Sequence, residues 1–371
     1  MSIIQWFHNN KIMKFKYLTI LFLLFLFEFA SGQIPGTPRI LSKSNFPQVF
    51  TLSAEIVDFS SALFKAQVLD NGQTTVTQSG IIWGTSIPTI SSATANGTIL
   101  TRSGSGTITG SITLNTLSPV PSSLVTYYIQ AYAINAAGTT YGDVITYEHG
   151  SVKSPTGKTW LAYNLGASKI PTTISDADGL GSYYQWGRGS DDHEIFRPLP
   201  SATTQTLSTS TSPDNGGAFI LGQNNPQVPA QITTWGNSKT FADWLTTRNE
   251  ELWQGVNGTN NPCPNGYRLP TIEEFQNEVN YFSSSNSTGA FASILKLTTN
   301  GLRSNNTGNI QSATRGNYWT SSTYFKRDAQ SFQPAYYMGR PIFIASLIIT
   351  YPTGDGDGLR AQGMGVRCIK D

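Results

Sequence analysis

Charged residues are scarce in this chain of 371 residues. Asp, Glu, Lys and Arg together make up 12% of it, against roughly 25% in an average soluble domain. Ser, Thr, Asn and Gly must therefore supply most of the polar surface, a composition common among secreted β-rich proteins. The 24 basic and 22 acidic residues leave a net charge of +2. The sequence has no basic stripe of the kind that nucleic acid requires, so we expect no nucleic-acid partner.

Histidine is also rare, which limits the catalytic chemistry open to the chain. The chain has 3 histidines, and His193 is the only one beyond residue 156. It is flanked by Asp191, Asp192 and Glu194. Such residues could serve in acid–base catalysis or bind a metal if they converged in a cleft. A polar loop that holds a glycine-containing turn is the favoured interpretation. We therefore expect no catalytic residues, no cofactor and no enzymatic activity.

Only one long hydrophobic run occurs, and it lies near the N-terminus. A lysine-containing segment precedes the apolar stretch Tyr17 to Phe27, and small residues suited to cleavage follow. This pattern predicts a secretory signal peptide over residues 1–32, with a run too short to span a bilayer. Either Met1 or Met13 could be the true start. No lipobox cysteine directly follows the run, so we expect neither a lipid anchor nor a transmembrane anchor. We expect secretion or residence on the outer cell surface.

Export bears directly on the only two cysteines, Cys263 and Cys368. Each is the other's sole candidate partner within the chain. Thiols in an oxidising compartment commonly form disulfides. The sequence therefore predicts a disulfide between them.

Short strands separated by turns are predicted over residues 48–148. Asn71-Gly72 is a strong hairpin signal, and no helical period appears in this region. The pattern predicts an all-β sandwich of roughly 100 residues. The expected strands are Val49–Val57, Leu63–Leu69, Thr75–Gly84, Thr107–Leu114, Leu124–Asn135 and Thr139–Tyr147.

The most specific part of this region is the segment Tyr127–Gly138, which follows Leu117-Ser118-Pro119. Its alternation places Tyr127, Ile129, Ala131 and Ala133 on one inward face. Tyr127 stands where a tyrosine corner would bond its hydroxyl to the preceding loop. Together with Gly80–Gly84, the segment resembles a fibronectin type III-like (Ig-like) module of exported proteins of the Bacteroidetes. The resemblance implies a spacer.

A nine-residue stretch, Cys263–Thr271, combines a turn, a short strand and a helix start. Pro264-Asn265-Gly266 has the composition of a turn. Thr271 and Glu274 have the spacing of a capping box, so a helix should begin there. Apolar residues recur behind it at helical spacing and predict one buried face: Ile272, Phe275, Val279 and Phe282.

The composition changes after a predicted linker at residues 149–156. Aromatic side chains at this density should fill a core, with at most one or two exposed; a sugar-stacking platform is the alternative. Phe241, Trp244 and Leu245 predict a short helix. Six of the 8 tryptophans follow the linker: Trp160, Trp186, Trp235, Trp244, Trp253 and Trp319.

Several blocks after the linker carry a second resemblance. In order they are Trp160-Leu161-Ala162-x-Asn164-Leu165, Tyr184–Arg188, Asp192–Glu194, Pro262–Thr271, Tyr318–Ser322 and Val366–Asp371. Together they resemble the Fibrobacter succinogenes major paralogous domain of exported bacterial proteins, over residues 155–371. The resemblance implies a C-type lectin-like fold, an α+β unit whose first helix region is often disulfide-tied to its last strand. It implies no established activity. The expected architecture is multidomain, an all-β sandwich followed by this α+β domain.

Recognition chemistry in such a fold is expected in two loops that vary over a fixed core, Asn300–Arg315 and Lys326–Pro341. Amide groups and aromatic faces suit a neutral glycan. The alternative is that these side chains only keep the long loops solvated. The candidate ligand-binding residues are Asn305, Asn306, Asn309, Gln311, Arg327, Tyr336, Tyr337 and Arg340.

A calcium site is not expected. Asp355 and Asp357 could donate oxygens to calcium, but a glycine-rich turn is the favoured interpretation. The triplets Glu-Pro-Asn and Gln-Pro-Asp of calcium-dependent lectins are absent from the chain.

The sequence therefore predicts a secreted or surface-associated, non-enzymatic binding protein whose partner is an extracellular glycan or a surface protein. Two alternatives remain open: an exported enzyme acting on polysaccharide or protein side chains, and a purely structural surface component. Carboxylates with raised pKa values facing one cleft would favour the enzyme. The sequence leaves open the identity of the ligand, whether any calcium is bound, the oligomeric state, and whether the protein resides in the periplasm or outside the cell.

Overall fold

The computed structural model describes residues 44–90, 99–102, 106–113, 124–212, 216–222, 243–247, 249–311, 313–327, 334–344, 349–350 and 359–371. The predicted signal peptide and the two aspartates considered for calcium, Asp355 and Asp357, lie outside these ranges. Within them the chain is mostly β-sheet with few helices. None of the helices in the described part is long and apolar enough to cross a membrane.

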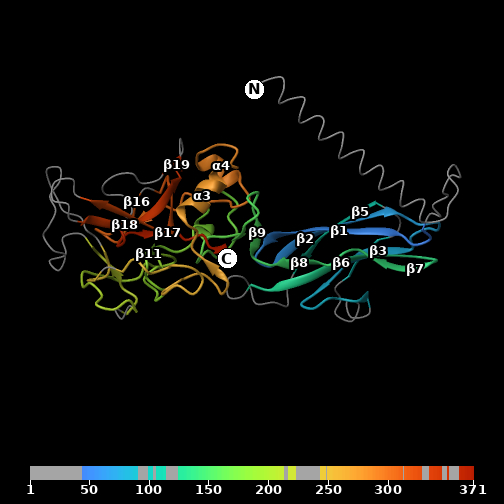
Figure 1. Cartoon of the computed structure of the whole chain (residues 1–371), viewed down its shortest axis with the longest axis horizontal. Coiled ribbons are helices and arrows are strands. Elements are labelled where there is room, and N and C mark those ends of the chain that lie inside the picture. Colours follow the sequence, from blue (N-terminus) through green and yellow to red (C-terminus); the bar gives the residue numbers. More distant parts are fainter. Residues whose placement is uncertain are drawn as a thin grey trace, which may run out of the picture. The chain divides into compact units, whose positions relative to one another are not determined.

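The first part of the chain is a sandwich of two antiparallel sheets (Figure 1). One sheet has the order β1-β2-β5, from Gln48–Asp58, Ser61–Asp70 and Gly106–Thr113. The other has the order β4-β3-β6-β7, with β8 also paired to β6. Its strands are Ile99–Arg102, Gln78–Gly84, Thr126–Asn135, Gly138–Tyr141 and Ile145–Glu148. The predicted all-β sandwich is confirmed, and β4 is a strand that the sequence did not predict.

Alternating residues of β2 and β6 fill the space between the two sheets. Tyr127, Ile129, Ala131 and Ala133 are all buried and belong to one cluster, as their spacing predicts. The Tyr127 hydroxyl is buried and has no hydrogen-bond partner among the described residues. The loop at residues 114–123, which the tyrosine-corner prediction requires, lies outside the described residues, so that prediction stays untested.

The segment expected as one strand, Thr139–Tyr147, forms two strands, β7 and β8. The pairing with β6 shifts by one residue between Tyr132–Tyr141 and Ile129–Ile145, so residues 142–144 hold one extra residue and separate β7 from β8. A Cβ on Gly142 would lie 2.9 Å from the backbone nitrogen of Thr51 on β1, so glycine is the residue that fits this close approach.

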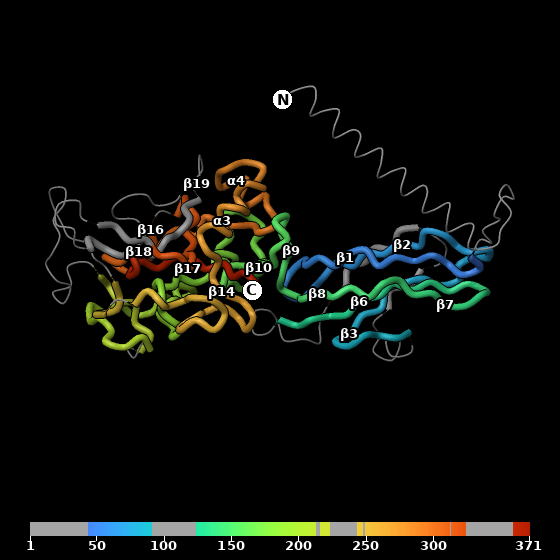
Figure 2. Tube along the Cα trace, in the orientation of Figure 1, coloured from blue at the N-terminus to red at the C-terminus, as the bar shows by residue number. Residues whose placement is uncertain are grey.

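Strand pairing in the second part of the chain includes residues of the predicted linker. Residues Ser151–Lys153, expected in a linker, form β9 and pair with β10 (Thr159–Leu161). A tight turn joins the two strands, because Ser154 N donates to Lys158 O at 2.8 Å. Two strands from distant parts of the chain complete the sheet, in the order β14-β21-β10-β9. Figure 2 labels β9, β10 and β14 and marks the C-terminus beside them. They are β14 (Tyr267–Arg268) and β21 (Ile369–Lys370).

Three further sheets are described in the second part of the chain. Their orders are β11-β20-β15-β16, β17-β18-β19 and the parallel pair β12-β13. The bounds are β11 Tyr184–Gln185, β12 Thr203–Thr204, β13 Phe219–Ile220, β15 Leu302–Arg303, β16 Ile310–Gln311, β17 Gly316–Arg327, β18 Pro334–Ile344, β19 Ile349–Thr350 and β20 Gly363–Met364, with a 3-10 turn η1 at Ala177–Gly179.

The predicted capped helix is α3, Ile272–Val279, and a second helix, α4, spans Ser287–Ala292. The capping box is present: Thr271 Oγ1 accepts from Glu274 N at 3.2 Å, and Glu274 Oε2 accepts from Thr271 N at 2.9 Å. No helix forms at residues 243–247, where one was expected. Leu245 instead makes a parallel bridge with Ser208, so tertiary pairing overrides the local pattern.

The tryptophans form the interior of the second part. Five of the six are fully buried: Trp160, Trp186, Trp244, Trp253 and Trp319. Four of the five donate their indole N–H to a buried oxygen, as buried tryptophans usually do. The core interpretation is therefore confirmed for these five, and none of them can form a sugar-stacking platform. Trp235 lies outside the described residues.

Candidate functional site

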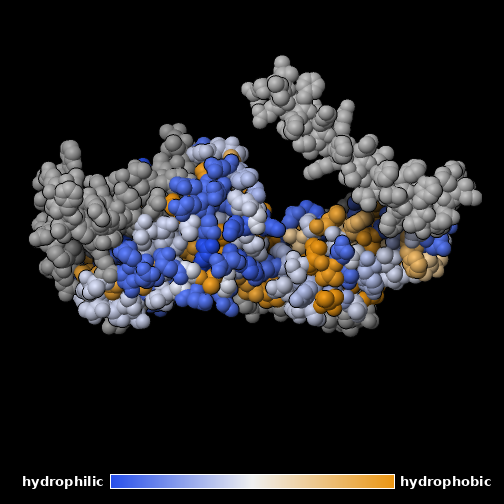
Figure 3. Space-filling view, viewed as in Figure 1, coloured by the Kyte–Doolittle hydropathy of each residue, from blue (hydrophilic) through white to orange (hydrophobic). Residues whose placement is uncertain are grey.

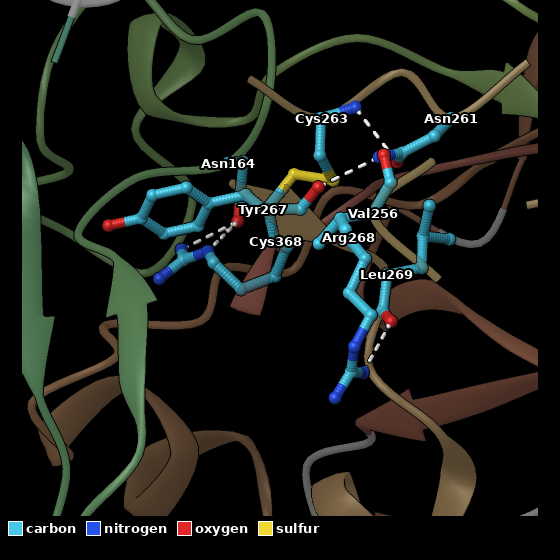
Figure 4. The surroundings of a disulfide bond; sticks show 9 residues. Asn164, Val256, Asn261, Cys263, Tyr267, Arg268, Leu269 and Cys368 are labelled. Atoms are coloured by element: carbon cyan, nitrogen blue, oxygen red, sulfur yellow. Dashed lines mark hydrogen bonds between the residues drawn. A yellow bond between two sulfur atoms is a disulfide. The ribbon is translucent and has the colours of Figure 1, made fainter. Parts of the chain in front are cut away.

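The predicted disulfide between Cys263 and Cys368 is present, with the Cα atoms 5.9 Å apart (Figure 4). It joins the turn before β14 to the residue before β21. Asn261 organises that turn: its Oδ1 accepts from Cys263 N at 3.2 Å, and its Nδ2 donates to Tyr267 O at 2.7 Å. Both sulfurs are therefore used for a structural link, and neither is available as a nucleophile.

The first predicted recognition loop is a short turn between β15 and β16. These strands pair antiparallel, with Arg303 opposite Ile310. Ser304 N donates to Asn309 O, and Gly308 N donates to Ser304 O, each at 2.8 Å. Gly308 has a φ of 70°, a conformation that favours glycine. The backbone of this turn is therefore held by its own hydrogen bonds.

The four amide residues predicted here divide into two groups. Asn306, Asn309 and Gln311 are exposed, so their amides face solvent. Asn305 is only 6% exposed, and its Nδ2 has no hydrogen-bond partner among the described residues. Its backbone oxygen accepts from Gly222 N at 2.9 Å. The predicted set therefore supplies three solvent-facing amides, while Asn305 packs beneath them.

Arg303 supports the turn from below and was not predicted from the sequence. It is fully buried, and its Nε donates to Gly308 O at 2.8 Å. The other guanidinium nitrogens donate to His193 O at 2.9 Å and to Ser201 O at 2.8 Å. Burial and the nearby Arg188 charge lower the pKa of Arg303 to about 10, so it stays charged at neutral pH. No local pattern marks an arginine in a two-residue strand as buried.

His193, Asp191 and Glu194 do converge, with potential metal ligand atoms within 4.8 Å of one another. His193 Nε2 lies 3.0 Å from Gln185 N, a backbone donor, so this ring nitrogen must accept. The ring proton is therefore on Nδ1, which donates to Asp191 Oδ1. Arg188 also binds Asp191, through Nη2 at 2.6 Å.

The tautomer of His193 decides what this cluster can do. Both ring nitrogens are engaged by the protein, and the imidazole is fully buried. Burial lowers the pKa of His193 to about 4, and burial raises the pKa of Glu194. A neutral imidazole with no free lone pair cannot ligate a metal, and a buried one cannot exchange protons with a substrate in a cleft. The geometry fits the predicted polar loop.

The prediction of a second loop at Lys326–Pro341 is wrong, because most of this segment belongs to the paired strands β17 and β18. In that ladder Tyr336 lies opposite Lys326, and Tyr337 lies opposite Phe325. Arg327 ends β17, and Arg340 is inside β18. The side chains of these four predicted residues lie outside the described part.

Two adjoining hollows lie beside β9, in a region that the sequence did not predict as a site. The larger, about 610 Å³, is lined by β9 and by residues Ala54–Val57 of β1. The smaller, about 410 Å³, is lined by residues that include Pro155, Tyr281 and Phe282. Both are lined by Lys153 and Ile294, so they meet there.

Comparison with known proteins adds little to this geometry. A search against protein-family models finds no match, and no curated protein matches the chain. Among solved structures, the chain is similar to the 6th fibronectin type III domain from human fibronectin type III domain containing protein 3. The identity is 25%, the match covers 28% of this chain and 80% of that domain, and the TM-score is 0.16. The sandwich is defined by the pairing of its own strands.

Proposed function

We propose that this protein is a secreted or surface-associated, non-enzymatic binding protein that recognises a neutral glycan. The fibronectin type III-like sandwich serves as a spacer. The second part is a C-type lectin-like domain of the Fibrobacter succinogenes major paralogous kind, and it presents the binding turn. The observation that carries this proposal is the group of exposed amides on Asn306, Asn309 and Gln311, held above the buried Arg303.

The chemistry of that turn suits a ligand rich in hydroxyl groups. Each amide offers a carbonyl acceptor and two N–H donors, which match sugar hydroxyls without requiring charge. The turn is held by its own hydrogen bonds and by Arg303. A site that is ordered before binding loses less conformational entropy when the ligand arrives, so weak polar contacts can still give measurable affinity.

The geometry of the charged cluster supports a binding role over catalysis. An acid–base site needs a titrating group that reaches the substrate. His193 is buried and uses both ring nitrogens within the protein, while Asp191 is held by Arg188. Arg303 also donates to the His193 carbonyl, so the cluster supports the turn.

The test is an array of neutral glycans probed with the full-length exported protein in its disulfide-bonded form. We expect one class of glycan to bind. Replacing Asn306, Asn309 and Gln311 together by alanine should reduce that signal by roughly tenfold or more, because each lost hydrogen bond contributes on the order of 1 kcal/mol. Tyr336→Ala and Tyr337→Ala, on β18, test whether the second predicted group belongs to the same site.

Asn277→Ala is the matched control, because it removes an exposed amide from the outer face of α3. It should leave glycan binding unchanged and should keep thermal stability the same or raise it slightly. The triple variant should also keep its thermal stability, because all three side chains are exposed. Absence of glycan binding by the wild type, or equal binding by the triple variant, would refute the proposal.

A further inference from the structure

Strand β9 has one edge that pairs with no strand in the described part of the chain. It lies at the end of its sheet and pairs only with β10. Gly150 O accepts from Ala162 N at 2.9 Å, and Ser154 N donates to Lys158 O at 2.8 Å. Successive residues of a strand direct their backbone groups to opposite sides. Gly150, Val152 and Ser154 therefore face β10, while the N–H and C=O groups of Ser151 and Lys153 face away from it.

The free edge opens onto the two hollows, which together we call the β9 groove. Ser151 and Lys153 line the larger hollow, and Lys153 also lines the smaller one. The groove walls carry apolar side chains, among them Ile56, Ile170, Ile294 and Phe282. Unpaired backbone groups beside an apolar groove are the features by which an extended peptide is recognised as an added strand.

The charges along the β9 groove are not balanced. Lys370 pairs with Glu148 at 2.9 Å, and Glu55 pairs with Lys65 at 2.8 Å. Lys153 and Lys296 also line the groove, and neither forms an ion pair with a carboxylate among the described residues. Lys296 Nζ instead lies 5.4 Å from the ring centre of Phe291. Glu278 also lines the smaller hollow, but it is 2% exposed and its Oε1 accepts from Ser154 Oγ and Trp160 Nε1. Two exposed lysines therefore face one buried carboxylate, and this excess of positive charge favours an acidic occupant.

We propose that the β9 groove binds an extended acidic peptide segment of a partner protein, which adds to the sheet as a strand beside β9. The backbone groups of Ser151 and Lys153 would hold the peptide backbone, since they are spaced two residues apart, about 6.6 Å. Lys153 and Lys296 would hold its carboxylates. A second copy of this chain fits less well, because edge-to-edge pairing of two β9 strands would gather four of these lysines in one groove.

Lysines on edge strands also deter unwanted strand pairing, and the experiment separates that role from recognition. Fluorescein-labelled Val-Glu-Val-Glu-Val is titrated with the full chain, and polarisation is measured. The charge control is Val-Lys-Val-Lys-Val, and the backbone control is the acidic peptide N-methylated at alternate residues. We expect saturable binding of the acidic peptide only, weakened at ~500 mM salt because screening acts on the exposed lysines. N-methylation should weaken binding roughly tenfold or more, because it removes backbone donors.

Variants of the lysines test the charge contribution. Lys153→Ala and Lys296→Ala should each weaken binding by roughly threefold, the size expected for exposed charge pairs. Lys158→Ala is the matched control: this lysine lies in the turn between β9 and β10, is half exposed, and lines neither hollow. It should leave the affinity unchanged.

Amide hydrogen exchange gives a direct readout of strand addition. The peptide should slow exchange at the Ser151 and Lys153 amides and leave Val152, which already faces β10, unchanged. Four results would overturn the proposal: no binding of the acidic peptide, binding that N-methylation does not change, binding that Lys158→Ala weakens as much as Lys153→Ala, and dimerisation that excludes the peptide. The last would assign the edge to a second copy of the chain.

Discussion

Arg367 and Asn164 are 203 positions apart in the sequence and meet in the core of the second part. The Asn164 Oδ1 accepts from Arg367 Nη2 at 2.6 Å and from Nε at 3.2 Å. Both residues are fully buried. Burial lowers the pKa of Arg367 to about 10, so the guanidinium stays charged at neutral pH. Asn164 therefore supplies oxygen contacts to a buried cation that has no carboxylate partner among the described residues.

Replacing Asn164 by alanine should lower the free energy of unfolding by about 3 kcal/mol, because the buried guanidinium loses its two hydrogen bonds to the Asn164 side chain. Asn164 Nδ2 also donates to Thr298 Oγ1 at 2.9 Å, so a second buried group loses its partner. Urea denaturation measures the effect, with Asn277→Ala as the exposed control. A double-mutant cycle of Asn164→Leu and Arg367→Met should lose less stability than the sum of the single changes, whereas additive losses would show that the pair is not coupled.

Removing the disulfide by Cys263→Ser and Cys368→Ser should lower the free energy of unfolding by about 4 to 5 kcal/mol in the chain-entropy model. The reason is that the bond joins residues 105 positions apart and restricts the unfolded chain. Denaturation of the oxidised protein and of the double variant gives the difference. A thiol titration of the native protein should find no reactive sulfhydryl, and two should appear after denaturation with reductant. Two reactive thiols in the native protein would contradict the structure.

The cap of α3 allows a smaller and more local test. Thr271→Ala removes the oxygen that accepts from Glu274 N at 3.2 Å. The loss should be about 1 kcal/mol, the usual cost of an N-cap hydroxyl. Asn277→Ala in the same helix should be neutral or slightly stabilising, because alanine has the higher helix propensity. Equal losses for both variants would show that the cap contributes nothing specific.

His193 should make the protein less stable in acid. Burial lowers its folded-state pKa to about 4, whereas the unfolded imidazole takes up a proton near pH 6.5. Between these two values the unfolded chain binds a proton that the folded chain does not, so stability falls as the pH falls. Glu194, whose pKa is raised by burial, acts in the opposite direction.

The size of the His193 contribution follows from the same linkage. Between pH 7 and ~4.5 it should remove about 2 kcal/mol from the free energy of unfolding. His193→Asn should lose less stability than the wild type over this interval, because the titrating group is gone. Urea denaturation at the two pH values provides the comparison. An identical pH slope for the two proteins would mean that His193 does not contribute.

Local chemistry was sufficient to predict several elements. Inward residues such as Tyr127 and Ile129 follow from alternation, because successive side chains of a strand point to opposite faces. The start of α3 follows from Thr271 and Glu274, whose spacing alone lets each cap the other's backbone. The disulfide follows because Cys263 and Cys368 have no other partner in the chain. In each case the signal is carried by a few nearby residues or by a unique pair.

The tertiary structure decided the elements that have no such signal. Ser151–Lys153 looked like a linker, because a strand of three residues shows no period and forms only when β10 pairs with it. Arg303 and Arg367 are buried, although arginine is usually exposed, because oxygens distant in sequence converge on them in the fold.

The candidate site shows the same division between local and tertiary information. Sequence composition alone marked the amides near residue 306 and the carboxylates around His193. Which of these amide and carboxylate side chains can reach a ligand depends on how deeply the fold buries each one. Asn306 is exposed while Asn305 is enclosed, and both ring nitrogens of His193 are engaged by the protein. A residue's type sets the bonds that it can make, whereas its position in the folded chain sets which of those bonds remain free for a ligand.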